Sequence, residues 1–197
     1  MQVYISTSVS EHTDALRRCL DCIAQIREWL ANNRLTLNED KTQIMWLGTR
    51  QQLSNVTTQT LTLSNACVQF SDTVNDLGVI IDSQLTMADH ITAVNRACFY
   101  QRRQLRTIRK CLAPETTRML VQPFMGSQLD YDNSLLVGLS AQLLQRLQVM
   151  QNAAACLVTV ARKYDHISPI LQELHWLPVR KRITFKLTVL VLNVCMA

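Results

Sequence analysis

The sequence predicts an α+β protein in which one helix and several short antiparallel strands are followed by an all-helical bundle. Short β-rich runs are confined to the first 82 residues, and the apolar spacing becomes helical from Thr86 onward. The charge changes at the same place. Residues 1–82 carry six Lys and Arg against nine Asp and Glu, whereas residues 83–197 carry fourteen against six. We therefore expect two regions, residues 1–83 and residues 84–197.

The first region is predicted to begin with a strand and a helix. The opening stretch "MQVYISTS" is typical of a strand. Residues 8–33 then place apolar side chains on one helical face, namely Leu16, Leu20, Ile23, Trp29 and Leu30. Ser8 and Glu11 have the spacing of a capping box, and Asn33 favours a left-handed helix stop.

The rest of the first region is predicted to form short strands. The stretch "RLTLNEDKTQIMWLG" has the pattern of a turn followed by a strand. Three further β-rich runs follow it: "VTTQTLTL", "ACVQF" and "DLGVIID". Ser, Asn and Asp separate these runs, as is common between strands. We expect a small antiparallel meander or a pair of hairpins.

The second region is predicted to be a bundle of about five helices. Thr86 and Asp89 repeat the capping-box spacing, Pro114 fits the first turn of another helix, and Ser140 fits an N-cap. The first long helix has an apolar stripe formed by Ile91, Val94, Cys98, Leu105, Ile108 and Leu112. The last helix begins at Pro178, and its expected buried side contains Val179, Ile183, Phe185, Leu187 and Leu190.

Composition and cysteine usage limit the class of protein. The chain is 48% hydrophobic and 18% charged, which is ordinary for a globular protein. It has no run of about 18 apolar residues, so we expect no membrane span. The seven cysteines have no paired spacing, which favours a reducing, intracellular environment in the cytoplasm or nucleus. Cys19 and Cys22 form a CxxC without a second ligand pair, so we do not expect zinc there.

The sequence lacks the common motifs for hydrolysis, phosphate cradling and metal binding, such as HExxH, G-x-S-x-G and the Walker loop. We interpret the histidines as surface, capping or structural residues; they are His12, His90, His166 and His175. Asp130 and Asp132 have a spacing that could hold a metal ion. An isolated DxD in a turn more often caps the local backbone, however. We therefore predict no metal site in this chain.

The most ordered charge feature is a row of cations on one predicted helix. Residues 96–118 hold seven cations and one anion, Glu115, so the acidic partners of an ordinary salt-bridged helix are missing. A row of cations can follow a phosphate backbone without base specificity. The alternative is a solvated helix face. Four cations share one face, at about 100° per residue: Arg96, Arg103, Arg106 and Lys110.

A second basic segment, "ELHWLPVRKRITFKL" at residues 173–187, joins an apolar corner to the start of a helix. Cations at a helix start oppose the helix dipole at a cost of roughly a few tenths of a kcal/mol each. A sequence that accepts this cost has a use for the charges. We predict a packed corner with a basic rim, and we add Arg180 and Arg182 to the candidate nucleic-acid contacts.

Three blocks in the observed order resemble one known family. "NEDKTQIMWLG", "VNDLGVIIDSQLTMADHI" and "LHWLPVRKRITFK" together are similar to the distal half of a non-LTR retrotransposon reverse transcriptase of the jockey-like, LINE-type group. The resemblance covers essentially the whole chain. It implies that residues 1–83 are the edge of a polymerase palm, with the sequence blocks lettered D and E. It also implies that residues 84–197 are the helical thumb.

The resemblance implies roles for particular residues. Asn38 and Lys41 match the Asn-x-x-Lys pattern of block D, whose lysine is thought to assist protonation of pyrophosphate. Leu77 and Gly78 match the centre of block E, the hairpin that grips the primer strand. The expected partner is therefore an RNA/DNA primer–template. The family's Mg²⁺ ions are held by carboxylates of blocks A and C, which match nothing in this chain.

We therefore expect a fragment without a cofactor of its own, inactive as a polymerase unless it is joined to the upstream palm and fingers. Family members also continue beyond "FKLTVLVLNVCMA", so the thumb is expected to be truncated. Two alternatives remain open. One is a helical interaction or structural module, and the other is the translated remnant of a decayed element with no nucleic-acid role.

Overall fold

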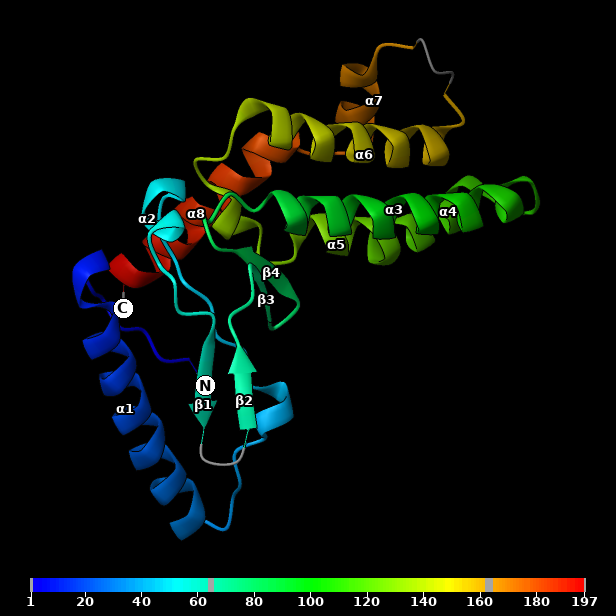
Figure 1. Ribbon diagram of the computed structural model, residues 1–197. Helices are drawn as coiled ribbons and strands as arrows, with labels where there is room; N and C mark the ends of the chain where they lie inside the picture. The colour runs from blue at the N-terminus through cyan, green and yellow to red at the C-terminus, as the bar shows by residue number, and fades with distance from the viewer. Residues whose placement is uncertain (1, 64–65, 162–164, 197) are drawn as a thin grey trace. The chain divides into compact units, whose positions relative to one another are not determined.

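The computed structural model describes residues 2–63, 66–161 and 165–196. The protein is α+β, as predicted: helices hold most of the chain and the strands form two small antiparallel sheets (Figure 1). The chain divides into two compact units, Met1–Leu85 and Thr86–Ala197. This division lies two residues beyond the boundary expected from the sequence.

The first unit begins without the expected strand. Residues 2–8 have no regular secondary structure, and Tyr4 is 73% exposed. The prediction was wrong because a strand needs a neighbouring strand, and residues 2–8 pair with none of the described strands. The Gln2 side chain instead donates a hydrogen bond to the carboxylate of Asp76.

The long helix of the first unit is preceded by a 3-10 turn, η1 (Val9–Glu11), and then runs as α1 (His12–Asn32). Ser8 Oγ donates to the carboxylate of Glu11 and caps no backbone amide, so the capping box predicted there is not formed. Asn33 has φ −98°, and the left-handed residue is Arg34, with φ 57°. The helix therefore stops at Asn33 as predicted, but the left-handed residue is the one after it.

The strands of the first unit form two separate hairpin sheets, one of the two predicted arrangements. β1 (Thr60–Leu63) pairs with β2 (Ala66–Gln69), and β3 (Thr73–Asp76) pairs with β4 (Val79–Asp82). The buried strand residues are Leu61, Leu63 and Val79.

The strand expected after the turn at residues 38–41 is reduced to one bridge. Ile44 pairs in parallel with Phe70, and the Phe70 ring stacks on Trp46 with 5.0 Å between the ring centroids. Two short helices flank this segment: η2 (Glu39–Lys41) and α2 (Arg50–Ser54). A full capping box between Thr49 and Gln52 starts α2, which the sequence analysis did not predict.

The second unit contains helices and turns and no strand within residues 86–161 and 165–196. Its longest elements are α3 (Ala88–Ile108), α6 (Ala141–Thr159) and α8 (Val179–Cys195). The shorter ones are η3 (Arg109–Cys111), α4 (Pro114–Val121), the π-helical turn η4 (Gln122–Gly126), α5 (Ser127–Asp130), η5 (Asn133–Leu136) and α7 (Ile167–Glu173). Pro114 at the first turn of α4 and the Ser140 cap of α6 confirm the predictions.

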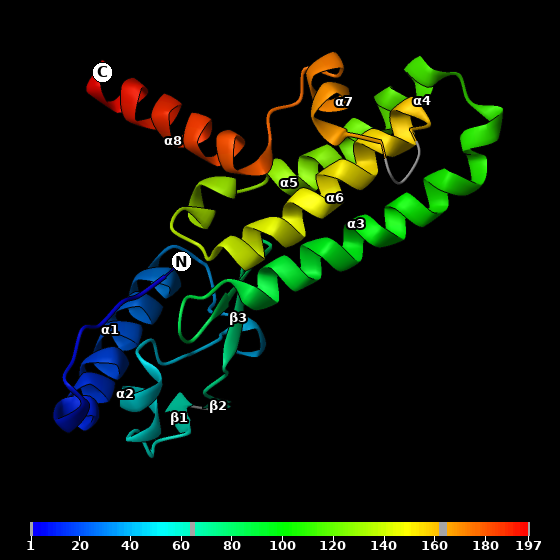
Figure 2. The ribbon, with the colours of Figure 1, turned by 90° about the horizontal axis from the view of Figure 1, so that it is seen from above.

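The core of the second unit lies between α3 and α6, which run side by side (Figure 2). From α3 it contains Ile91, Cys98 and Leu105, as the apolar stripe predicted; Ile108, however, is 47% exposed. The other core residues include Val121, Met125, Leu147, Met150, Ala154, Ala155 and Val158. α3 itself begins after Met87, which has φ 59°, and the Thr86 hydroxyl accepts from the Ala88 amide at 3.3 Å, so the helix starts one residue later than the predicted cap.

The last helix, α8, is buried only at its start. Val179 and Ile183 are buried, as predicted, but Phe185, Leu187 and Leu190 are exposed. The prediction failed for these three because α8 contacts η5 and α6 through its first turns, and from residue 184 to 196 only Val189 is even half-buried. The exposed apolar side chains beyond that point include Val191, Leu192, Val194 and Met196.

Candidate nucleic-acid interface

The row of cations predicted on α3 is present as an exposed face, here called the basic row: Arg96, Arg103, Arg106 and Lys110. The first three lie on α3 and the fourth on η3, which continues directly from it. At 1.5 Å rise per residue, Arg96 and Arg106 are about 15 Å apart along the axis. Within the described ranges none of the four forms an ion pair or a side-chain hydrogen bond.

Arg109 lies between Arg106 and Lys110 in the sequence, but its side chain makes different contacts. Its guanidinium donates to the carbonyls of Leu157 at 2.9 Å and Val158 at 3.2 Å, and also to the carbonyl of Leu112. The first two carbonyls lie in the last turn of α6, where backbone acceptors have no helical partner and the helix dipole favours a cation. Arg109 therefore ties the end of α3 to the end of α6 and does not extend the basic row.

The two candidates at the start of α8 differ in the same way. Arg182 donates to Asp130 at 2.6 Å and to the carbonyl of Leu177 at 3.1 Å, and its side chain is 15% exposed. Arg180 is exposed, and among the described residues its side chain forms no ion pair or hydrogen bond; its backbone carbonyl accepts from the hydroxyl of Thr184. Arg182 is therefore part of the packed corner, and Arg180 is part of its basic rim.

Glutamine side chains of α6 hold the corner before α8. Gln148 Oε1 accepts from the backbone amide of Val179 at 2.9 Å, and Gln151 Nε2 donates to the carbonyl of Leu177 at 2.7 Å. His175 is exposed and has φ 56°, so it turns the chain. The corner is thereby fixed to the core, which fixes where Arg180 emerges.

Asn38 and Lys41 are joined in one small turn of the first unit. Asn38 Oδ1 accepts from the Lys41 backbone amide at 3.1 Å, and its carbonyl accepts from the Thr42 hydroxyl at 2.9 Å. An ion pair of 3.0 Å between Arg27 and Glu39 attaches the turn to α1. This arrangement leaves the Lys41 side chain exposed, where its ammonium can donate to an anion.

Leu77 and Gly78 form the two-residue loop between β3 and β4. Both have positive φ, 48° and 90°, as in a type I′ turn, and Asn75 Oδ1 accepts from the Gly78 amide at 3.1 Å. Leu77 is 84% exposed. A left-handed conformation costs a residue with a Cβ about 1 kcal/mol or more, so the turn holds an apolar side chain in solvent at some expense.

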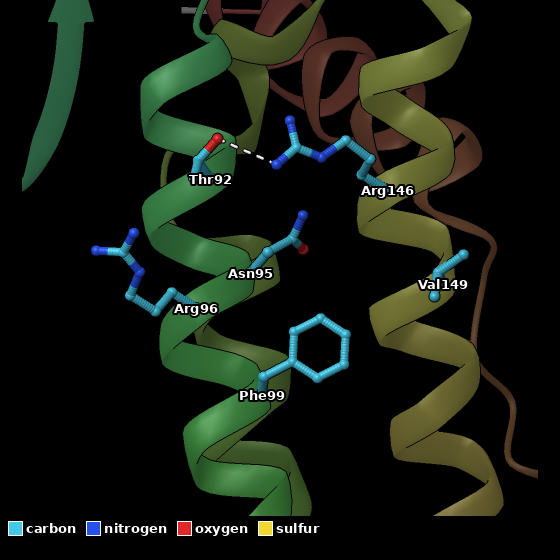
Figure 3. Close-up of a pocket in the computed structure, with 6 residues that line it drawn as sticks. All are labelled: Thr92, Asn95, Arg96, Phe99, Arg146 and Val149. Atoms are coloured by element: carbon cyan, nitrogen blue, oxygen red, sulfur yellow. Dashed lines mark hydrogen bonds between the residues drawn. The ribbon is translucent and has the colours of Figure 1, made fainter.

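A groove that the sequence analysis missed lies between α3 and α6 (Figure 3). Its volume is about 350 Å³, and its lining residues are Thr92, Asn95, Arg96, Phe99, Arg146 and Val149. Asn95 is the residue that could have indicated the groove from the sequence. It is a polar residue in the apolar stripe, four positions after Ile91 and three before Cys98. A polar residue at a buried stripe position indicates either a hydrogen-bond partner within the fold or a ligand.

The buried titratable groups of α3 have shifted pKa values. Burial lowers the pKa of His90, and the nearby Asp132 carboxylate acts in the opposite direction. Burial raises the pKa of the Cys98 thiol to about 11. Both groups are therefore uncharged at neutral pH, and they belong to the core and not to a reactive site.

Within residues 2–63, 66–161 and 165–196, no three His, Cys, Asp or Glu side chains are grouped as metal ligands. Asp130 is engaged with Arg182, and the backbone of Asp132 is left-handed, with φ 46°. In the same ranges, none of the helices has the length and apolar character needed to cross a bilayer.

Comparisons of the chain with protein-family models, with curated proteins and with solved structures found no match.

Proposed function

We propose that the protein is a fragment of a non-LTR retrotransposon reverse transcriptase, and that its own activity is sequence-tolerant binding of an RNA–DNA primer–template duplex. The observation that carries the proposal is the basic row. Four cations face solvent on one side of a rigid helix, and none is neutralised within the part of the chain that the structure describes.

The contrast with the other arginines supports a use for these four. Arg109 and Arg118 donate to backbone carbonyls, and Arg182 forms an ion pair with Asp130. The basic row differs from these three arginines in having no side-chain partner among the described residues. A duplex backbone offers phosphates along this length, and each contact releases bound counterions, which favours binding at low salt.

The resemblance to the polymerase family supports roles for the first unit. The β3–β4 hairpin presents Leu77 and Gly78 at its tip, as a loop that grips a primer strand would. Lys41 extends from a fixed turn beside Asn38, as a proton donor to pyrophosphate would. The matching blocks do not include those whose carboxylates hold Mg²⁺ in that family. We therefore assign binding, and not polymerisation, to this chain alone, and we assign catalysis to its union with the upstream palm and fingers.

One observation favours a second candidate, a protein-interaction module. From residue 184 onward α8 exposes a run of apolar side chains, which is typical of a surface that another protein covers. This candidate predicts association through α8 without any need for the basic row.

The test is a titration of the full chain with a fluorescein-labelled, blunt RNA–DNA duplex between about 50 and 200 mM salt. A variant with Gln at all four positions of the basic row is compared with a control in which Arg34, Arg50, Lys181 and Lys186 become Gln. Both variants lose the same charge, and all eight side chains are exposed. We expect the basic-row variant to lose affinity and to flatten the plot of log K against log salt by about 0.9 per lost contact.

The control should keep most of the wild-type affinity and slope. Equal behaviour of the two variants would show that net charge, and not the basic row, attracts the duplex. No binding by the wild type would leave the interaction module as the better candidate.

A further inference from the structure

The groove between α3 and α6 combines features that the basic row alone does not explain. Asn95 and Phe99 extend from α3 toward α6, one turn apart, and Arg146 and Val149 face them from α6 (Figure 3). It is an open groove of about 350 Å³. The groove lies entirely within the second unit.

Asn95 is the polar group in the floor of the groove. Its side chain is almost completely buried, with the residue 8% exposed, and its Oδ1 has no hydrogen-bond partner among the described residues. A buried acceptor without a donor costs about 1–3 kcal/mol of folding stability. A ligand that brings an N–H group to this position would remove that cost.

Arg146 gives the groove its charge. Arg146 donates from one nitrogen to the Thr92 hydroxyl at 3.1 Å, which holds its guanidinium across the groove. Arg96 also lines the groove and is the first member of the basic row, but its guanidinium extends away from α6 (Figure 3). The lining contains no carboxylate. An anion is therefore favoured near its mouth.

Phe99 supplies an aromatic surface. It is 48% exposed, although it lies one residue from the fully buried Cys98, and its ring extends into the space between the helices (Figure 3). An exposed aromatic face flanked by cations is typical of sites that stack a nucleobase. An acidic peptide could use Arg146 and donate a backbone N–H to Asn95, but it would leave the Phe99 ring without a stacking partner.

We infer that the groove takes one unpaired nucleotide of the bound strand. The base stacks on Phe99, its polar edge donates to Asn95 Oδ1, and its phosphate lies against Arg146. This inference rests on the proposed function, because it places the nucleotide at the end of the duplex that the basic row holds. It adds a preference for a duplex that continues into single strand.

The experiment compares two fluorescein-labelled probes with the full chain: the blunt RNA–DNA duplex, and the same duplex with four unpaired nucleotides at one RNA end. The variant Phe99→Leu keeps an apolar side chain and removes the stacking face. The control Tyr100→Leu changes the neighbouring aromatic residue, which is 61% exposed and does not line the groove. Asn95→Leu is a second groove variant that removes the amide at similar volume.

We expect the wild type to bind the extended probe roughly five- to tenfold more tightly than the blunt one. Phe99→Leu and Asn95→Leu should each lose most of this preference and keep the affinity for the blunt duplex, whereas Tyr100→Leu should keep both. Circular dichroism of each variant checks that the helices are formed.

The two proposals fail in different ways. Salt-sensitive binding of both probes with equal affinity, or an unchanged preference in Phe99→Leu, would overturn this inference and leave the proposed function in place. Failure to bind either probe would overturn both. Displacement of the extended probe by polyglutamate, with Phe99→Leu behaving as the wild type, would show that the groove holds an acidic protein segment instead.

Discussion

Arg182 and Asp130 form an ion pair of 2.6 Å that joins the first turn of α8 to the end of α5. The two side chains are 15% and 43% exposed, so solvent screens the carboxylate more than the guanidinium. We expect Arg182→Gln to lower the free energy of unfolding of the second unit by about 1 kcal/mol. Urea unfolding followed by circular dichroism measures this change.

Arg180→Gln is the matched control, because Arg180 lies two residues away and its side chain is exposed. It should leave stability within about 0.5 kcal/mol of the wild type. Duplex affinity should show the opposite order: Arg180→Gln should bind the duplex more weakly than Arg182→Gln. Equal stabilities would contradict the structural role of Arg182.

Asn95→Leu is expected to stabilise the second unit by about 1 kcal/mol, because it replaces a buried acceptor that lacks a donor with an apolar side chain of similar size. The midpoint of urea unfolding should rise without a change in slope. A fall in the midpoint would mean that the Asn95 side chain is satisfied within the fold.

Leu77→Asn is expected to stabilise the first unit by roughly 0.5–1 kcal/mol. Leu77 has φ 48° in a two-residue hairpin loop, where Asn is among the residues that adopt positive φ most easily. Thermal unfolding is the measurement. Gly78→Ala is the opposite control, because Gly78 has φ 90° and a Cβ there should be destabilising. If Leu77 grips a primer strand, Leu77→Asn should weaken duplex binding as it raises stability.

Acid is expected to destabilise the second unit through His90. Burial lowers the pKa of His90 below its ordinary value of 6.5, so the unfolded chain takes up a proton near that pH that the folded chain does not. The free energy of unfolding should therefore fall as the pH drops from 7.5 through 6.5 toward 5.5. His90→Gln should remove this part of the slope, and the same change at the exposed His175 should preserve it. Identical slopes in both variants would assign the effect to other groups.

Local pattern was sufficient for much of this fold. The apolar spacing located α3 and three of its core residues, Ile91, Cys98 and Leu105, since a helix repeats every 3.6 residues whatever surrounds it. The same spacing placed the basic row on the exposed face. The change from β-rich to helical pattern near residue 84 corresponds to the division of the chain after Leu85.

Features that depend on distant partners were not predictable in this way. Residues 2–8 have strand-like composition, but no sequence pattern shows whether a neighbouring strand exists. Arg182 was grouped with solvent-exposed cations because its partner, Asp130, lies 52 residues earlier. The groove forms only where α3 and α6 come together. Two of its residues, Thr92 and Arg146, are 54 positions apart in the sequence. Only Asn95 gave a local sign of it.

Cys98 gives the chain an internal reporter of motion. It is fully buried, and its pKa of about 11 keeps it protonated at neutral pH, whereas only an accessible thiolate is alkylated. Cys67, Cys111 and Cys195 are exposed and can react without any opening of the fold. The slow phase of alkylation at Cys98 therefore measures how often α3 and α6 separate under native conditions. A nucleotide held between these two helices would lengthen that phase.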